Sequence, residues 1–178
     1  MLVHNAIGTN VISCLGDEEQ RKRFLTKSIN MDEIACFCLT EPLNGSDASG
    51  LRTVARKVPG GYLINGSKRW IGNATFADQL CVWARNLDDG NNIQCFIVTK
   101  GSKGLNASKI MNKVSLRMVE NADITFEDVF VPDQNRLTHA TNFQTGTNVI
   151  LESSRLGVAW VAAGVATGAY EAALRYAL

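Results

Sequence analysis

The sequence has very few histidines and no strong excess of either charge. His4 and His139 are the only two histidines and lie far apart in the chain, so they offer neither a ligand-spaced metal cluster nor the base of a nucleophilic triad. The formal net charge of +1 gives no electrostatic basis for binding nucleic acid. No G-x-G-x-x-G segment occurs, which argues against a Rossmann-type dinucleotide loop.

Cysteine pairs and long apolar runs are also lacking. Five cysteines occur, at Cys14, Cys36, Cys38, Cys81 and Cys95. Their number is odd, they form no C-x-x-C pair, and most lie in apolar runs, which is typical of buried reduced thiols. No apolar stretch approaches the roughly 20 residues that a membrane-spanning helix needs. We therefore expect reduced thiols and no membrane span.

Helical patterns occupy the first 30 residues. Apolar residues recur every fourth position from Val3 to Leu15, which predicts one amphipathic helix that ends near Gly16. Asp17 with Gln20 three positions later predicts a capping box, and hence a second helix that runs to about residue 28.

From residue 34 the pattern becomes that of strands. Short apolar or alternating runs occur at 34–39, 51–58, 62–64, 67–71, 79–85, 93–98 and 122–131. Asn65-Gly66 between two of these runs predicts a tight hairpin turn. Several strands at this spacing predict an antiparallel barrel or sandwich. The fold class is therefore α+β, an antiparallel β-barrel middle domain flanked by helices.

Residues 147–178 return to a helical pattern rich in Ala, Val and Leu. Gly157, Gly164 and Gly168 lie on this helix, and each costs up to about 1 kcal/mol relative to Ala, which predicts close packing against a neighbouring helix. Helical periodicity continues to Leu178. We expect the chain to be a piece of a larger protein whose other helices, or a second subunit, cover this apolar surface.

Two strand ends carry residues that can hold a ligand. One apolar run ends in T-E-P and opens into N-G-S-D, over residues 40–47. Another ends in K-R-W-I-G-N, over residues 68–73. A buried strand that ends in small and hydroxylated residues presents backbone N–H groups and hydroxyls to a ligand. The repetition predicts that both ends share one ligand cleft.

These segments resemble a known family of flavoproteins. L-T-E-P-x-x-G-S-D, G-x-K-x-W-I-x-N, F-E-D-V-x-V-P and R-x-G-x-A-W occur in this order, as in the acyl-CoA dehydrogenase and acyl-CoA oxidase superfamily. The stretches around these motifs look most similar to the short-chain acyl-CoA oxidases of plant peroxisomes, and next to the glutaryl-CoA dehydrogenases. The resemblance divides the chain into the end of an N-terminal helical domain (1–33), a β-barrel middle domain (34–140) and the first helix of a C-terminal bundle (141–178).

The resemblance implies FAD as the cofactor and an acyl-CoA as the substrate. It assigns flavin contacts to Phe37, Cys38, Leu39, Thr40, Gly45, Ser46, Trp70, Ile71 and Gly72. It assigns substrate contacts to Glu41, Ser46, Glu152 and Arg155. For Glu41 the contact is made by the backbone N–H, which would bind the thioester carbonyl as an oxyanion donor, while its carboxylate makes a structural contact.

The catalytic base is expected outside the chain. Ser154 occupies the position where one branch of the family has its glutamate base, and a serine hydroxyl cannot abstract a thioester α-proton near neutral pH. The alternative base position of the family would lie beyond Leu178. We therefore expect no catalytic residue in these 178 residues, weak binding of FAD, and no turnover by this chain alone.

Gly72 replaces a threonine that most dehydrogenases of the family carry. The glycine either leaves room for O₂ beside the flavin or serves a turn that needs a positive φ. The first interpretation predicts a peroxisomal oxidase that forms the 2,3-trans double bond of a short-chain acyl-CoA in fatty acid β-oxidation, reduces O₂ to H₂O₂, and works as a homo-oligomer. The alternatives are a mitochondrial acyl-CoA or glutaryl-CoA dehydrogenase that reduces an electron-transfer flavoprotein, and a non-catalytic binding module.

Overall fold

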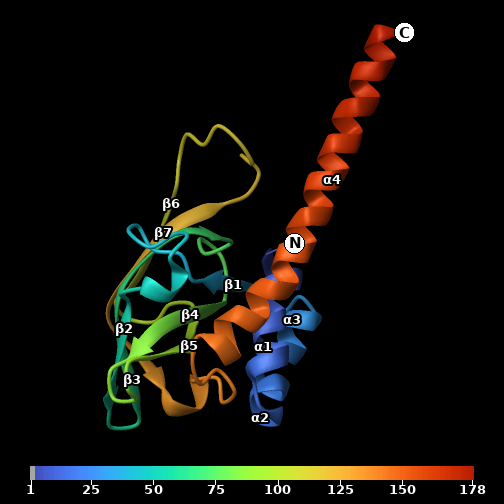
Figure 1. Ribbon diagram of the computed structural model, residues 1–178. Helices are drawn as coiled ribbons and strands as arrows, with labels where there is room; N and C mark the ends of the chain where they lie inside the picture. Colours follow the sequence, from blue (N-terminus) through green and yellow to red (C-terminus); the bar gives the residue numbers. More distant parts are fainter. Residues whose placement is uncertain (1–2) are drawn as a thin grey trace.

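The computed structural model describes residues 3–178. Figure 1 shows a curled sheet, a small group of N-terminal helices beside it, and one long helix that extends away from both. Met1 and Leu2, which belong to the predicted N-terminal segment, lie outside the described residues.

The N-terminal helices form as the sequence predicts. They are η1 (Val3–Gly8), α1 (Thr9–Leu15), α2 (Glu18–Gln20), η2 (Arg21–Leu25) and α3 (Thr26–Ile29). Val11 and Leu15 of the predicted apolar face are buried. The capping box is confirmed, because the Gln20 N–H donates to Asp17 Oδ1 at 2.9 Å and the Asp17 N–H donates to Gln20 Oε1 at 3.1 Å.

Within residues 3–178, seven strands form one mixed sheet. They are β1 (Ala35–Cys38), β2 (Val54–Val58), β3 (Gly61–Gly72), β4 (Gln79–Asn86), β5 (Asn92–Thr99), β6 (Leu105–Lys109) and β7 (Asn121–Pro132). The order is β1-β4-β2-β3-β7-β6, with β5 on the other side of β4. The predicted α+β class with a curled β domain between helices is confirmed. The all-antiparallel arrangement is wrong, because β1 and β2 both pair with β4 in parallel. Apolar periodicity encodes which face a strand buries but not its direction.

The predicted hairpin at Asn65-Gly66 is also wrong. β3 runs through these residues without turning, with a bulge between Ile64 and Gly66. The Asn65 side chain exchanges two hydrogen bonds with Asp128 of β7, at 2.8 and 2.9 Å. The turn of this hairpin lies at Pro59-Gly60 instead, between β2 and β3. Both dipeptides favour turns, and the long pairing of β3 with β7 decided between them.

Strand β6 was not predicted because it has no apolar run. It is a mostly exposed edge strand that pairs only with β7. Its residues, Leu105-Asn106-Ala107-Ser108-Lys109, are largely polar, as is common for edges that must not pair with other chains.

Two apolar cores lie on the two faces of the sheet. One fills the curl of the sheet and includes Ile64, Ile124 and Val129. The other joins the sheet to the helices around the fully buried Trp83 and includes Ile150 of the long helix. This second core fixes the base of that helix against the β domain. All five cysteines are free, as predicted, and all but Cys14 are buried.

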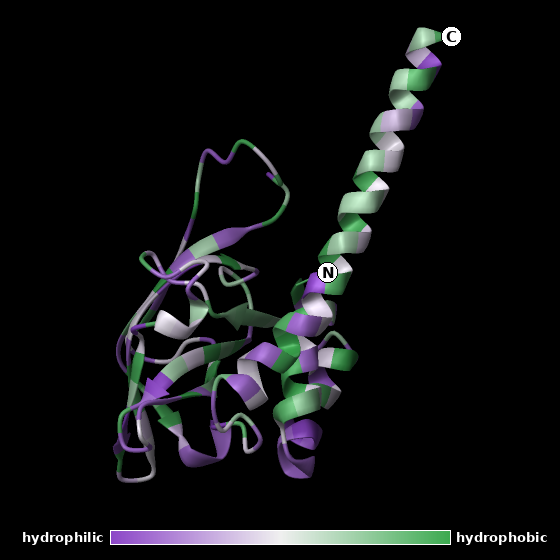
Figure 2. Cartoon of the chain, viewed as in Figure 1, coloured by the Kyte–Doolittle hydropathy of each residue, from purple (hydrophilic) through white to green (hydrophobic). Residues whose placement is uncertain are grey.

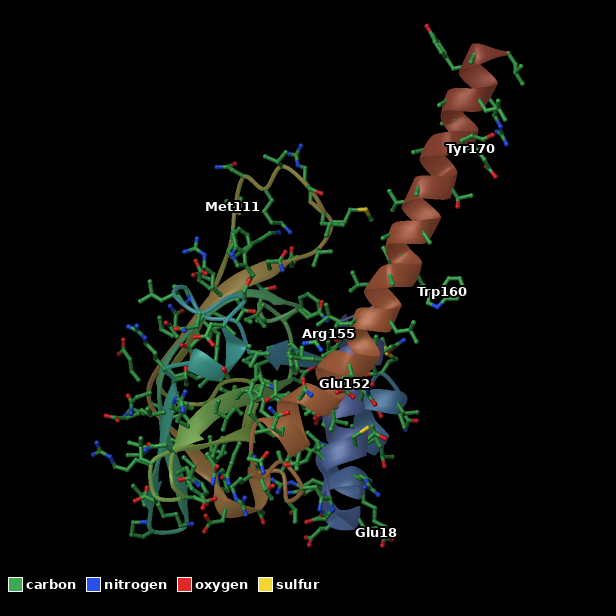
Figure 3. All side chains as sticks on the ribbon, viewed as in Figure 1. Glu18, Met111, Glu152, Arg155, Trp160 and Tyr170 are labelled. Carbon is green, nitrogen blue, oxygen red and sulfur yellow. The ribbon has the colours of Figure 1, made fainter. Side chains whose placement is uncertain are left out.

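The chain ends in η5 (Gln144–Asn148) and the long helix α4 (Val149–Ala177). Beyond its base, α4 consists largely of hydrophobic residues (Figure 2), and its large apolar side chains are exposed. Trp160 and Tyr170 point away from the β domain (Figure 3). A Cβ at Gly157, Gly164 or Gly168 would meet no atom within 4 Å, so their predicted packing against another helix stays a prediction.

By length and composition alone, this helix could also cross a membrane. From Gln144 to Ala177 its most apolar window has a mean hydropathy of 1.4. The prediction that no stretch approaches the length and apolar character of a membrane-spanning helix was therefore too strict. Ala, Gly and Val together make this window apolar without a continuous run of large side chains. A core helix of a soluble bundle passes the same test, and no other observation supports a membrane span.

Candidate functional site

The two predicted strand ends lie side by side. The Arg69 N–H donates to the Thr40 carbonyl oxygen at 2.8 Å. This hydrogen bond joins the end of β3 to the residues that follow β1, although the two strands are not neighbours in the sheet. The two segments therefore lie close together, as predicted, but the predicted shared cleft is not borne out, because residues 68–73 do not line the cleft at Thr40.

A buried ion pair lies directly beneath these strand ends. The Lys68 Nζ donates to the Leu39 carbonyl oxygen at 3.0 Å and to Glu41 Oε1 at 2.9 Å. The Glu41 carboxylate also accepts hydrogen bonds from Arg52 N at 2.6 Å, Thr53 N at 2.9 Å and Thr53 Oγ1 at 2.6 Å. Both side chains are almost fully buried. The predicted structural contact of the Glu41 carboxylate is confirmed.

The ion pair keeps the Glu41 carboxylate ionised despite its burial. Burial by itself raises the pKa of Glu41, but the Lys68 charge and the hydrogen bonds from Thr53 and Arg52 outweigh it, so that pKa lies below its usual value. For Lys68, burial lowers the pKa, and the attraction of Glu41 offsets only part of the effect. Glu41 is therefore an ionised structural group rather than a base poised near neutrality.

The lowered pKa of Glu41 predicts acid sensitivity. A carboxyl whose pKa is depressed in the folded state contributes stability above its unfolded pKa and loses it as pH falls through the folded pKa. We expect the free energy of unfolding to fall as pH drops below about 4.5, with a shallower slope in Glu41→Gln. Urea unfolding at several pH values measures both slopes, and Asp17, whose pKa the Gln20 backbone N–H lowers, remains as an internal reference. Equal slopes in the wild-type chain and in Glu41→Gln would contradict the conclusion that the pKa of Glu41 is lowered in the folded state.

An open cleft of about 350 Å³ adjoins the strand ends. One wall is formed by Leu39, Thr40 and the loop from Gly45 to Ser49. The opposite wall is formed by residues at the base of the long helix and just before it: Phe143, Leu151 and Arg155. The cleft therefore combines hydroxyls, loop backbone and the Asp47 carboxylate with an apolar wall and a guanidinium group.

Arg155 supplies the positive charge of the cleft. No carboxylate lies within 4 Å of its guanidinium anywhere in residues 3–178. Figure 3 shows it at the base of α4, close to the β domain. An arginine without a carboxylate partner is free to bind a phosphate or carboxylate of a ligand.

Several predicted flavin contacts do not reach this cleft with their side chains. The Phe37 ring packs edge-on against Trp83, with 6.1 Å between ring centroids. Cys38 and Ile71 are buried in the core inside the curl of the sheet. Successive side chains of a strand point to opposite faces, so only the backbone of some of these residues could face a ligand. Glu152, a predicted substrate contact, does not line the cleft and accepts a hydrogen bond from Asn148 Nδ2 at 3.0 Å.

Trp70 lies outside the cleft but is presented to solvent by a local distortion. Its side chain is 51% exposed and its φ is +62°, an uncommon conformation for a bulky residue. The β3–β7 register shifts between Lys68 and Ile71, and the Asn121 Nδ2 donates to the Trp70 carbonyl oxygen at 2.9 Å. Such strain is typical of ligand contacts, and the sequence did not predict it.

The backbone N–H of Glu41 is not a free donor. It donates to the Asn44 carbonyl oxygen at 3.1 Å, and the Asn44 N–H donates back to the Glu41 carbonyl at 3.3 Å. A thioester carbonyl would have to replace the first of these bonds. The predicted role of this N–H as an oxyanion donor remains a prediction that the turn geometry argues against.

Sequence reasoning missed Lys68, Phe143 and Leu151. Phe143 and Leu151 become cleft residues only because α4 packs against the sheet, and no local pattern marks them. Lys68 left one signal: a lysine lies in one of the two strand ends, and Glu41 lies in the other. Buried charges are paired, so the two residues could have been matched.

The fold and the cleft define a β domain with an open cleft between the segment that follows β1 and the base of a long helix. The family model for the middle domain of acyl-CoA dehydrogenases matches residues 36–129. The chain belongs to the acyl-CoA dehydrogenase family.

Similar proteins cover nearly the whole chain. It is 36% identical over 177 residues to an acyl-CoA dehydrogenase of Bacillus subtilis, which covers 98% of the chain and 47% of the relative. It is 33% identical over 180 residues to the mitochondrial short-chain specific acyl-CoA dehydrogenase of Rattus norvegicus, covering 99% and 43%. The solved structure of a glutaryl-CoA dehydrogenase from Mycobacterium smegmatis in complex with FADH2 superimposes with a TM-score of 0.82 at 33% identity, covering 88% and 39%.

These matches qualify two expectations. The chain spans about half the length of the curated relatives that it matches. The similarity to glutaryl-CoA dehydrogenases is confirmed, whereas the finer resemblance to plant peroxisomal oxidases is not supported, because these relatives are dehydrogenases.

Proposed function

We propose that this chain forms the flavin- and thioester-binding part of an FAD-dependent acyl-CoA dehydrogenase. The observation that carries the proposal is the cleft between Leu39, Thr40 and the loop from Gly45 to Ser49 on one side and Arg155 of α4 on the other. A relative with the same fold is described in complex with FADH2, and the relatives' names refer to acyl-CoA substrates.

The residues of the cleft fit part of an FAD. Thr40 and Ser46 offer hydroxyls, and Gly45 has no atom within 4 Å of a Cβ position, which leaves space for a close ligand. Phe143 and Leu151 form an apolar wall suited to a ring system. When bound, FAD would accept the electrons and the hydrogen removed from the substrate. The predicted flavin contacts of Trp70 would come from its exposed ring outside the cleft.

The chain positions the substrate but supplies no base. Arg155 would bind an anionic group of the CoA moiety. The Ser154 hydroxyl donates to the Leu151 carbonyl oxygen at 3.0 Å and cannot abstract an α-proton near neutral pH. Glu41 is held ionised in its ion pair. We therefore assign the base, and with it turnover, to a part of the enzyme outside this chain.

An electron-transfer flavoprotein is the better electron acceptor than O₂ for this proposal. The relatives are dehydrogenases, one of them mitochondrial, which favours the mitochondrial alternative over a peroxisome.

Gly72 gives little support for an oxidase. Its φ is not positive, so it does not serve a left-handed turn. A Cβ there would lie 3.0 Å from Val3 Cγ2, so the position does not open onto free space. The apolar surface of α4 favours a homo-oligomer.

A Gly72→Thr substitution tests the remaining oxidase candidate. Because the added Cβ would press on Val3, we expect a loss of stability of about 1–3 kcal/mol and no change in the O₂ reactivity of the flavin-loaded enzyme. Gly45→Ala, where a Cβ meets nothing within 4 Å, serves as the stability control. A marked slowing of flavin reoxidation by O₂ in Gly72→Thr would restore the oxidase interpretation.

Titration of the chain with FAD and with an acyl-CoA tests the proposal itself. We expect weak but saturable FAD binding, detected by flavin fluorescence, that Arg155→Ala leaves intact while it weakens acyl-CoA binding. No acyl-CoA oxidation is expected from the chain alone. A protein that binds neither FAD nor CoA esters would contradict the proposal and favour a non-catalytic module.

A further inference from the structure

The end of β1, which leads into the cleft at Leu39 and Thr40, and the end of β3, which carries Trp70 outside the cleft, are not joined directly by a sheet ladder. β1 pairs with β4, whereas β3 pairs with β2 and β7. Between the end of β1 and the end of β3 there is a single backbone hydrogen bond, from Arg69 N to the Thr40 carbonyl oxygen. Their other connection within the sheet is indirect, through β4 and β2, and the other direct polar contact between the two ends comes from the Lys68 side chain.

The Lys68–Glu41 ion pair supplies that connection. Lys68 extends from β3 and reaches the Leu39 carbonyl oxygen, whose residue lines the cleft. Its partner Glu41 binds the backbone of Arg52 and Thr53, just before β2. One ion pair thus ties together the segments that follow β1, precede β2 and end β3. Neither charged group lines the cleft.

We infer that Lys68 and Glu41 are positioning residues for the cleft. Resting on the proposed function, the inference is that their ion pair sets the distance between the Leu39–Thr40 backbone and the Arg69–Trp70 segment, and so holds the FAD-binding geometry without touching the ligand. A site depends on such supporting contacts, because a displacement of about 1 Å can cost roughly 100-fold in function.

The test compares three variants of the chain. Glu41→Gln/Lys68→Met removes both charges, so that no unpaired charge is left buried and the protein remains folded. Lys68→Met alone leaves the Glu41 carboxylate buried without its cation. Ile124→Ala is the matched control, because Ile124 faces Lys68 across the β3–β7 ladder, is fully buried, and does not line the cleft. Amide hydrogen exchange by NMR and the Kd for FAD are measured for each.

In the double variant we expect the Arg69 amide to exchange at least about 10-fold faster and FAD to bind roughly 10-fold or more weakly, while the Ile97 amide of β5 keeps its protection. Ile124→Ala should accelerate Arg69 and Ile97 alike and leave the Kd for FAD unchanged in the folded protein. A double variant with unchanged Arg69 exchange would overturn the inference. If the wild-type chain binds neither FAD nor an acyl-CoA, the proposed function fails, and the Arg69 exchange still decides whether the pair positions the strand ends.

Discussion

Replacement of Lys68 by methionine is expected to lower the free energy of unfolding by about 3–5 kcal/mol. The substitution leaves the Glu41 carboxylate buried without its cation and removes the donor to the Leu39 carbonyl oxygen. Removing one partner of a buried ion pair costs far more than the net contribution of the pair, because an uncompensated charge stays in a medium of low polarity. Urea unfolding followed by circular dichroism at neutral pH measures the loss.

Two further variants test whether the loss of stability in Lys68→Met comes from an unpaired buried charge. Glu41→Gln/Lys68→Met should recover most of the lost stability, because no charge remains buried. Lys109→Met breaks an exposed ion pair with Glu120, and such pairs contribute only about 0–1 kcal/mol. Equal losses for Lys68→Met and Lys109→Met would show that burial does not determine the cost.

The second large effect is expected from Gly66→Ala. Gly66 has a φ of +145°, and a Cβ there would lie 2.7 Å from the Thr53 Cα and 2.6 Å from its Oγ1. The first contact is with backbone, which cannot rotate away, and Thr53 also donates to Glu41. We expect a destabilisation of about 3 kcal/mol or more, measured by thermal unfolding.

Gly60→Ala is the matched control for Gly66→Ala. Gly60 has a φ of +79°, but a Cβ there would meet no atom within 4 Å. Only the conformational cost of a left-handed residue remains, about 1–2 kcal/mol. If both variants lost the same stability, the close approach of Gly66 to Thr53 would have no energetic weight.

Most elements could be predicted from local patterns. The capping box at Asp17 and Gln20 follows from side chains three positions apart, and the buried strands follow from runs of apolar residues. The hairpin was misplaced because Asn65-Gly66 and Pro59-Gly60 are both good turn sequences, and the choice between them depends on pairing with β7. The direction of β1 and β2 relative to β4 likewise follows from connections that local patterns do not describe.

The sequence predicted several of the residues that line the candidate site, but not which way their side chains point. The motifs identified Leu39, Thr40, Gly45, Ser46 and Arg155, all of which line one cleft. Phe37 and Cys38 directly precede the first motif and Ile71 belongs to the second, but the alternation of side chains along their strands turns them into the cores. Motif membership therefore indicated the segment, and the pleat of the strand decided which side chains could meet a ligand.

The sequence by itself determined the family, the helix–β–helix order and the two strand ends, because each depends on residues close together in the chain. The tertiary structure alone decided that Lys68 contacts Glu41, 27 positions away. It also decided that a register shift turns Trp70 outward and that Arg155 of α4 lines one wall of the cleft. Each of these contacts joins distant segments whose approach is set by the packing of the two cores, which no local pattern encodes.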